Sequence, residues 1–333
     1  MNRFVAYVPT YRPVGGVIKV FDYIVHAETM GAAELVVCCP EPVPVDGPLF
    51  ERFESLRPGS GVRFVEGFSV GVGPDDLAFF SWPRHYEEIA ARLDPFAPHE
   101  RVVHLVQNVR HANPAWDGGY PRRLLARPMS RIATNDIVAE AVRPFVHPSA
   151  LFATITLGHD TAFFAASNRS PLGSPIEVLT TTWKSSVGAE VARSMAHDER
   201  FAFTVLDEVV GWDDLRRAYA TADVFLGCPI AEEGFYLPAL EAMAAGAVVI
   251  VPDASGNMVY CRFDENCLQA ELDDPASYRT ALERVASMGT DEVSRLRGAA
   301  AATAEGFSLG HERSGFEAFV GRIETEARAR ERV

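Results

Sequence analysis

The chain has 333 residues, 48% of them hydrophobic, and carries a formal net charge of −14 at pH 7. That length and apolar content allow two domains, each with its own core, while the negative charge argues against a nucleic acid as partner. No apolar run reaches the roughly 18 residues of a membrane span, and the N-terminus has no signal-peptide pattern. A cytoplasmic protein is therefore expected, without a transmembrane segment.

The first half of the chain alternates between short apolar runs and helix-length segments, which is the pattern of a parallel sheet with crossover helices. Strands are predicted at Phe4–Val8, Glu34–Cys38, Val62–Val65, Leu77–Phe80, Val102–Val106 and Arg131–Ala133. Helices are predicted at Val17–Met30, Tyr86–Leu93 and Asp136–Val142. This half is expected to form one Rossmann-like domain.

A polar segment that contains proline and glycine, Ala166–Pro175, is the best domain boundary, and the alternation starts again after it. Strands are predicted at Ile176–Leu179, Phe201–Val205, Val224–Leu226 and Val248–Val251, and helices at Val187–Met195, Asp213–Ala220, Pro238–Ala245, Ser277–Ser287, Asp291–Thr303 and His311–Arg330. The predicted parts are residues 1–168, residues 169–310 and a C-terminal helix at 311–333. Two such domains imply a cleft between them, and parallel sheets bind ligands beyond the carboxyl ends of their strands.

The most informative segment is Glu233–Gly246, which reads Glu-Gly-Phe-Tyr-Leu-Pro-Ala-Leu-Glu-Ala-Met-Ala-Ala-Gly. Pro238 suits the first position of a helix, because its missing N–H would have no partner there. The amides of Gly234–Leu237 would then point out of the helix start, where partial positive charge favours an anion. A diphosphate on these amides, flanked by Glu233 and Glu241 as acceptors for hydroxyls, describes a nucleotide-sugar site. The alternative is structural, with an apolar face turned to the core and a solvated Glu241.

This string resembles the E-x7-E signature of retaining glycosyltransferases with the GT-B fold, of the family-four type. The usual form there is Glu-Gly-Phe-Gly-Leu-Pro-x-Leu-Glu-Ala-Met-Ala-x-Gly, and this chain has Tyr236 in place of the middle glycine. Tyr219–Leu226 resembles the strand entry Tyr-x-x-Ala-Asp-Val-Phe-Val of that family. Leu157–Phe163 resembles its crossing segment Asn-Gly-Val-Asp-Thr-x-x-Phe, and Phe263–Leu268 its loop Asp-Gly-x-Asn-Gly-Leu. A bulky ring at Tyr236 is expected to alter the pocket around the donor sugar or the acceptor.

The resemblance implies an α/β fold of the GT-B type, with two Rossmann-like domains whose parallel sheets face a cleft and a C-terminal helix that packs back toward the N-terminal domain. It implies catalytic roles for Glu233, which would hold sugar hydroxyls and stabilise positive charge on the ring, and for Lys184, which would neutralise the leaving diphosphate. The donor-binding residues implied in the same way are Gly15, Gly16, Thr182, Gly234, Phe235, Tyr236, Leu237 and Glu241, the last of them toward the ribose hydroxyls.

Lys184 and the Gly15-Gly16 pair each follow a predicted strand. The family has an arginine and, five residues later, a lysine in the loop of Lys184; here the arginine position falls on Leu179 or a threonine, so that half of the pair is missing. Glycines let the backbone approach a phosphate at a helix start. A surface lysine and an ordinary tight turn are the structural alternatives.

Gln107 ends the predicted strand Val102–Val106, where many family members have a histidine that faces the donor sugar. A glutamine can hydrogen-bond a hydroxyl but cannot take a proton. Arg110 and His111 are nearby substitutes, so all three are candidate contacts of the sugar or the acceptor. The alternative for His111 is a structural role.

No metal ion or other cofactor is expected. The nine histidines and five cysteines show no ligand spacing, and Asp75-Asp76 and Asp213-Asp214 are adjacent pairs rather than an Asp-x-Asp motif. The cysteines are expected to be reduced structural thiols, with a Cys261–Cys267 pair as the alternative.

The resemblance therefore predicts a metal-independent retaining glycosyltransferase of the hexosyltransferase type. It would move a sugar from a nucleoside-diphosphate sugar to a hydroxyl of a small molecule, a secondary metabolite or a glycan. The alternatives are a GT-B nucleotide-sugar epimerase, a phosphorylase, and a non-catalytic homologue that serves as a partner subunit or sugar-binding module. The sugar, base, acceptor and oligomeric state do not follow from the sequence.

Overall fold

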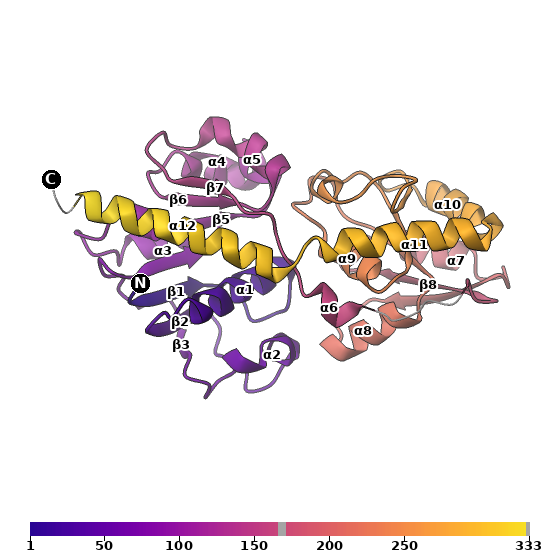
Figure 1. Ribbon diagram of the computed structural model, residues 1–333, viewed down its shortest axis with the longest axis horizontal. Helices are drawn as coiled ribbons and strands as arrows, with labels where there is room; N and C mark the ends of the chain where they lie inside the picture. The colour runs from indigo at the N-terminus through magenta and orange to yellow at the C-terminus, as the bar shows by residue number, and fades with distance from the viewer. Residues whose placement is uncertain (166–170, 331–333) are drawn as a thin grey trace. The chain divides into compact units, whose positions relative to one another are not determined.

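The computed structural model describes residues 1–165 and 171–330, and the chain forms two compact units (Figure 1). The first unit is Met1–Leu157 together with the segment from Leu309 onward, and the second is Gly158–Ser308. The predicted domain boundary at 168/169 therefore lies inside the second unit. The chain returns to the first unit at Leu309, two residues before the predicted start of the C-terminal helix at 311. Part of the predicted linker, residues 166–170, lies outside the described residues.

The first unit is built on a seven-stranded sheet in the order β3-β2-β1-β4-β5-β6-β7, in which every pairing is parallel. The strands are β1 (Arg3–Tyr7), β2 (Glu34–Cys39), β3 (Arg63–Glu66), β4 (Leu77–Phe80), β5 (Val102–Val106), β6 (Ser130–Ala133) and β7 (Phe152–Thr154). The helices are α1 (Gly15–Thr29), α2 (Pro48–Arg52), α3 (His85–Ala90), α4 (Tyr120–Leu125), α5 (Asp136–Val142) and α12 (Leu309–Arg330). The central strands β1, β4 and β5 are buried on both faces, as their largely apolar sequences predict.

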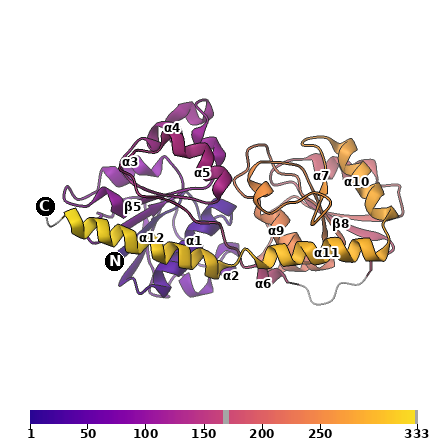
Figure 2. The same ribbon diagram turned by 45° about the horizontal axis from the view of Figure 1, so that its top comes forward.

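The C-terminal helix α12 lies against α1 in the first unit, as both views show (Figures 1 and 2). Phe316 of α12 contacts Phe4 and Tyr23 edge-on, with ring centroids 6.2 and 4.9 Å apart. The prediction that the C-terminal helix packs back onto the N-terminal domain is thus confirmed.

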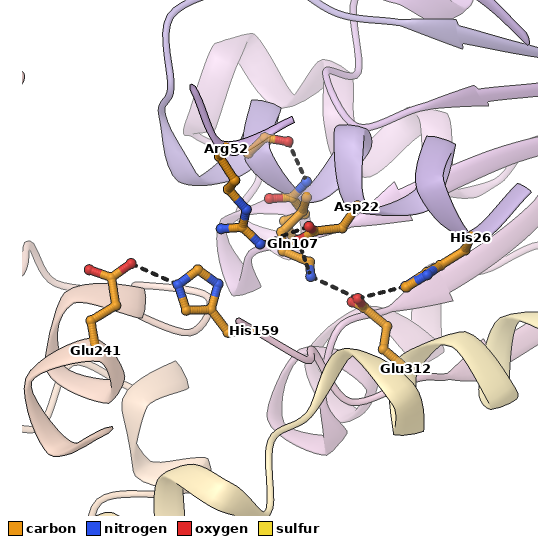
Figure 3. A network of polar contacts seen from close by, with 9 residues as sticks. Asp22, His26, Arg52, Gln107, His159, Glu241 and Glu312 are labelled. Carbon is orange, nitrogen blue, oxygen red and sulfur yellow. Dashed lines mark hydrogen bonds and ion pairs between the residues drawn. The ribbon is translucent and has the colours of Figure 1, made fainter. Parts of the chain in front are cut away.

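Buried ion pairs reinforce this packing (Figure 3). The Nζ atom of Lys19 on α1 lies 2.8 Å from Oε2 of Glu312 on α12 and 2.7 Å from Oδ2 of Asp22. His26 Nε2 lies 3.1 Å from the same Glu312 oxygen, and Arg52 of α2 is 2.7 Å from Oδ1 of Asp22. Because these charges are buried, removing one partner leaves another uncompensated, which is strongly destabilising.

The second unit contains a five-stranded sheet in the order β12-β11-β10-β8-β9, again parallel throughout. The strands are β8 (Ile176–Thr181), β9 (Phe201–Leu206), β10 (Val224–Leu226), β11 (Val248–Val251) and β12 (Leu268–Gln269), and the helices are α6 (Thr161–Phe164), α7 (Val187–Ser194), α8 (Trp212–Thr221), α9 (Leu237–Ala244), α10 (Pro275–Ser287) and α11 (Thr290–Glu305). Helix α9 is apolar almost all round and is buried nearly throughout, as expected for a helix inside a core.

Every predicted strand and helix is confirmed, within a few residues at each end. The elements that were not predicted are short: β7, β12, α2, α4 and α6. All five cysteines are free and buried, so the alternative Cys261–Cys267 disulfide is not observed. Among the described residues, no helix has both the length and the apolar character needed to cross a membrane.

Candidate functional site

The candidate site of the second unit lies where β8 and β10 end. These strands are parallel neighbours, with Val224 opposite Val178 and Leu226 opposite Thr180, so the loops that follow them leave the same edge of the sheet. The loop after β8 carries Lys184, and the loop after β10 leads into the turn Glu233–Tyr236 and helix α9. Two segments about 50 residues apart in the sequence therefore meet at the carboxyl edge, where parallel sheets bind ligands.

Lys184 and Glu233 form an ion pair at this edge. Lys184 Nζ lies 3.0 Å from Oε1 of Glu233. The carboxylate is almost fully buried, whereas the lysine side chain is 44% exposed. The two residues predicted to be catalytic are thus brought into direct contact, with the cation on the solvent side.

The backbone of the turn is fixed by a second loop. Glu233 makes an isolated bridge with Ser255, and the N–H of Gly256 donates to the carbonyl of Glu233 at 3.0 Å. A Cβ atom on Gly256 would run into the backbone carbonyl of Gly234, so only glycine fits at position 256. The position of Glu233 is therefore held by its backbone as well as by Lys184.

Helix α9 begins at Leu237, so Pro238 is its second residue. The prediction placed Pro238 at the first position. Proline is still favourable there, because the N–H groups of the first turn have no partner inside the helix. The first-turn amides of α9 supply the partial positive charge that favours an anion.

Tyr236 directly precedes α9 and adopts a left-handed backbone conformation, with φ 63° and ψ 69°. Its ring is buried at 5% exposure and packs on Gly227, where an added Cβ would lie 3.1 Å from Cε1 of the ring. Its carbonyl accepts a hydrogen bond from the Tyr260 hydroxyl at 2.6 Å. Burial raises the pKa of Tyr236 well above its ordinary value, so the phenol stays neutral. The ring is therefore buried within the second unit, and the expectation that it alters a ligand pocket stays a prediction.

Phe235 and Leu237 are also buried side chains, at 4% and 8% exposure. The Phe235 ring packs against Tyr260 and Phe307, with ring centroids 5.1 and 5.5 Å apart. Their side chains therefore pack in the core of the second unit, and the contacts of Gly234, Phe235 and Leu237 with a donor stay predictions.

Glu241 is 4% exposed and lies one turn inside α9. Its Oε1 atom is 2.8 Å from Nε2 of His159, a contact between two buried side chains of the second unit (Figure 3). The alternative of a solvated Glu241 is therefore wrong. The partner was missed from the sequence, because a single histidine more than 80 residues away carries no signal that it meets this glutamate.

The loop of Lys184 starts from a tight junction between β8 and α7. A Cβ atom on Gly188 would overlap the side chain of Thr180, so the glycine allows the helix to approach the strand closely. The N–H of Thr182 donates to the carbonyl of Leu206 at 3.0 Å, which extends the pairing of β8 with β9 to this half-buried residue. Gly188 was not singled out in the sequence.

In the first unit, Gly15 and Gly16 are the first two residues of α1 and follow the carboxyl end of β1. Gln107, at the end of β5, donates from Nε2 to the carbonyl of Gly16 at 3.1 Å. A Cβ atom on Gly16 would lie 3.4 Å from Oε1 of Gln107. The predicted loop and the predicted glutamine thus contact each other at one edge of the sheet.

Arg110 and His111 follow Gln107 but differ in exposure. Arg110 is partly exposed, and its guanidinium lies 5.3 Å from the ring centre of Trp116. His111 is buried between His104 and Trp116, with ring centroids 5.2 and 5.1 Å away. Burial lowers the pKa of His111 to about 3, so the ring is neutral at pH 7. His111 therefore packs in the core of the first unit, as its structural alternative states, and its contact with a substrate stays a prediction.

Within residues 1–165 and 171–330, no group of three or more His, Cys, Asp or Glu side chains is arranged to hold a metal ion. The positive charge available to an anion at the candidate site comes from Lys184 and the first turn of α9.

Comparisons with known proteins agree with this architecture. Residues 185–288, just under a third of the chain, match the family described as "Glycosyl transferases group 1". A search of curated proteins finds no match.

Three solved structures illustrate the similarity in fold. HepE of Anabaena, in complex with UDP and glucose, has a TM-score of 0.71 at 13% identity, over 97% of this chain and all of that one. Sucrose-phosphate synthase of Thermosynechococcus elongatus has a TM-score of 0.68 at 11% identity, and α,α-trehalose 6-phosphate synthase of Burkholderia multivorans has 0.64 at 14%; each comparison covers 98% of this chain and all of the other. With two parallel α/β units and a C-terminal helix that returns to the first, the chain has the GT-B fold.

Proposed function

We propose that the protein is a retaining glycosyltransferase that moves a sugar from a nucleoside-diphosphate sugar to a hydroxyl acceptor. The observation that carries this proposal is the ion pair between Lys184 and Glu233, 3.0 Å apart at the carboxyl edge of the second sheet and next to the start of α9. It places a cation, helix amides and a carboxylate together. The match of residues 185–288 to group 1 glycosyltransferases and the GT-B fold support it.

The transfer would proceed on one face of the donor sugar. The acceptor oxygen forms a bond to the anomeric carbon as the bond from that carbon to the diphosphate breaks. A phosphate oxygen of the leaving group takes the hydroxyl proton, so no strong protein base is needed. This agrees with a first unit that has Gln107 after β5 and keeps His111 buried and neutral.

Charge stabilisation would come from the candidate site. Lys184 and the first-turn amides of α9 would stabilise the negative charge that develops on the diphosphate. Glu233 would hold sugar hydroxyls and stabilise the positive charge on the ring. A bound donor would separate Lys184 from Glu233, since the lysine would turn toward the phosphates. In this scheme the cation and the helix take the role that a metal ion has in other transferases, so EDTA should leave activity unchanged.

The test is Glu233→Gln, with the neighbouring exposed residue as control in Glu232→Gln. Purified wild-type protein is first screened for thermal stabilisation by a panel of nucleotides and nucleotide sugars. With the donor found, loss of Glu233 should lower kcat by about 100-fold or more, while Glu232→Gln should retain full activity. Equal turnover by Glu233→Gln and wild type would refute the catalytic role.

A non-catalytic sugar-binding module is the second candidate. It is favoured by one observation: both signature glutamates have partners inside the second unit, Lys184 for Glu233 and His159 for Glu241. A nucleotide sugar that binds tightly but is neither transferred nor hydrolysed would establish this role. Conversion of the donor to an epimeric sugar without any acceptor would instead indicate an epimerase.

A further inference from the structure

Arg110 is an arginine of the first unit that has no carboxylate partner. It lies three residues after Gln107, in the loop at the carboxyl end of β5, and its side chain is only partly exposed. The acidic side chains of residues 1–165 and 171–330 form ion pairs with other arginines, such as Arg84 and Arg101, but none with Arg110. Since arginines that leave water are usually paired, the missing anion points to a ligand.

The guanidinium of Arg110 is held in one orientation. Its Nε donates to Oδ1 of Asn108 at 3.1 Å, and the same oxygen accepts from the backbone N–H of Arg110 at 2.9 Å. The guanidinium carbon lies 5.3 Å from the centre of the Trp116 ring, which covers one face of the group. The two terminal amino groups make no hydrogen bond to the described part of the chain. They form a planar fork, the shape that binds two oxygens of a carboxylate or phosphate side by side.

The surroundings of this fork are positively charged. Arg131 of β6 is fully buried and donates to the carbonyls of Met129 and Leu124 at 2.5 and 2.6 Å, and no carboxylate within the described ranges pairs with it. The pKa of His111 is lowered first by burial and then by the charges of Arg110 and Arg131. Two cations therefore act on one imidazole, in a chain whose net charge is −14. The local field at the loop after β5 thus attracts an anion.

The same loop also offers an acceptor for a hydroxyl group. Gln107 donates from Nε2 to the carbonyl of Gly16 at 3.1 Å, which fixes its amide at the start of α1 (Figure 3). Its Oε1 accepts no hydrogen bond from the residues that the structure describes and can take one from a hydroxyl. A hydroxyl acceptor and an oxyanion fork therefore stand three residues apart, at the edge where parallel sheets bind ligands.

We infer, on the basis of the proposed function, that Arg110 is a specificity-determining residue that binds an oxyanion of the acceptor, either a carboxylate or a phosphate monoester. Asn108 and Trp116 hold its guanidinium in place for this anion. The acceptor class is thereby narrowed from hydroxyl compounds in general to hydroxylated acids and phosphate esters. The phosphates of the donor would be bound separately, by Lys184 and the start of α9 in the second unit.

The experiment compares neutral polyols with their own anionic derivatives. Dissociation constants are measured by calorimetry, in the absence of a donor, for glycerol, glycerol 3-phosphate and glycerate, and for glucose, glucose 6-phosphate and glucuronate. In at least one of these series, an anionic compound should bind wild-type protein at least about tenfold more tightly than the neutral polyol, because hydrogen bonds between charged groups are stronger than those to a hydroxyl. The tighter of the two anions identifies the oxyanion as phosphate or carboxylate.

Three variants locate the anion. Arg110→Gln should reduce the preference for the anionic compound to about threefold or less, and Arg110→Lys, which keeps the charge but loses the fork, should retain only part of it. Arg143→Gln is the matched control, because Arg143 is an exposed arginine of the same unit that stacks on Phe152, with 4.6 Å to the ring centre, at the opposite edge of the sheet. This variant should keep the wild-type preference.

Two results would overturn the inference while leaving the proposed function standing. One is wild-type protein that binds none of the anionic compounds more tightly than the neutral polyol. The other is a preference that survives in Arg110→Gln but is lost in Lys184→Gln, which would place the anion at the donor site. The wild-type comparison decides the question even if a variant does not fold. If a preference that depends on Arg110 is found but no nucleotide stabilises the protein, the oxyanion site is established and the proposed function fails.

Discussion

At Tyr236 the structure predicts an unusual order of stability, in which glycine is tolerated better than alanine. The residue has φ 63°, a conformation that costs a non-glycine residue about 1–2 kcal/mol. Its ring is 5% exposed and packs on Gly227. Removing a buried aromatic ring costs about 3–5 kcal/mol, so both Tyr236→Ala and Tyr236→Gly should be destabilised.

The two variants differ in backbone strain. Alanine loses the ring and keeps the left-handed strain, whereas glycine loses the ring and the strain. Glycine also gains about 0.5–1 kcal/mol of conformational entropy in the unfolded chain, which opposes its advantage. The difference leaves Tyr236→Gly more stable than Tyr236→Ala by about 0.5–1 kcal/mol. At Ala239, in the regular part of α9, glycine should instead be less stable than alanine by about 1 kcal/mol.

The assay is urea unfolding followed by tryptophan fluorescence. Replacing Trp82 and Trp116 of the first unit by phenylalanine leaves Trp183 and Trp212, which both report on the second unit. Unfolding midpoints are then compared among the three substitutions in this background. If Tyr236→Ala is as stable as Tyr236→Gly, the left-handed conformation does not carry the strain assigned to it, and the reasoning is refuted.

Three further predictions concern packing, buried charge and pH. Gly188→Ala should destabilise the second unit by about 1–3 kcal/mol, because the new Cβ overlaps Thr180; Gly298→Ala, in open space on α11, should not destabilise it. Glu312→Gln removes a carboxylate from the buried ion pairs of α1 and α12 and should cost the first unit about 3–5 kcal/mol in urea unfolding; an effect no larger than that of neutralising an exposed glutamate of α12 would contradict this. Burial lowers the pKa of His111 to about 3, whereas a histidine of the unfolded chain has a pKa of about 6.5. Between these pH values the unfolded chain binds more protons than the folded protein, so the free energy of unfolding falls as the pH is lowered from about 6.5 to 4. His111→Phe should reduce this slope of unfolding free energy against pH by up to about 1.4 kcal/mol per pH unit, and an unchanged slope would show that His111 is not buried as a neutral ring.

The fold was largely accessible from sequence because its information is local. Apolar runs of four to six residues alternate with longer amphipathic segments, and this alternation predicts parallel sheets with crossover helices. The elements that escaped prediction, such as β7 and β12, have only three and two residues. Segments so short carry too little pattern and become strands only because a neighbouring strand already offers free hydrogen-bonding groups.

The meeting of Lys184 and Glu233 was also accessible, since each follows a strand and neighbouring parallel strands end at the same edge. The direction of the Tyr236 ring was not accessible. A sequence shows that a bulky residue stands where glycine is usual, but the open space beside Gly227 that receives the ring exists only after β10 and α9 have packed.

The sequence by itself therefore determined the succession of strands and helices, the two units and the signature glutamates. Only the tertiary structure decided what each polar side chain contacts. His159 and Glu241 are brought together by packing of the segment that enters the second unit against α9, and His111 is enclosed by His104 and Trp116. Such contacts depend on long-range packing rather than on local periodicity, because a side chain meets its partner only when the elements that carry both have found their places.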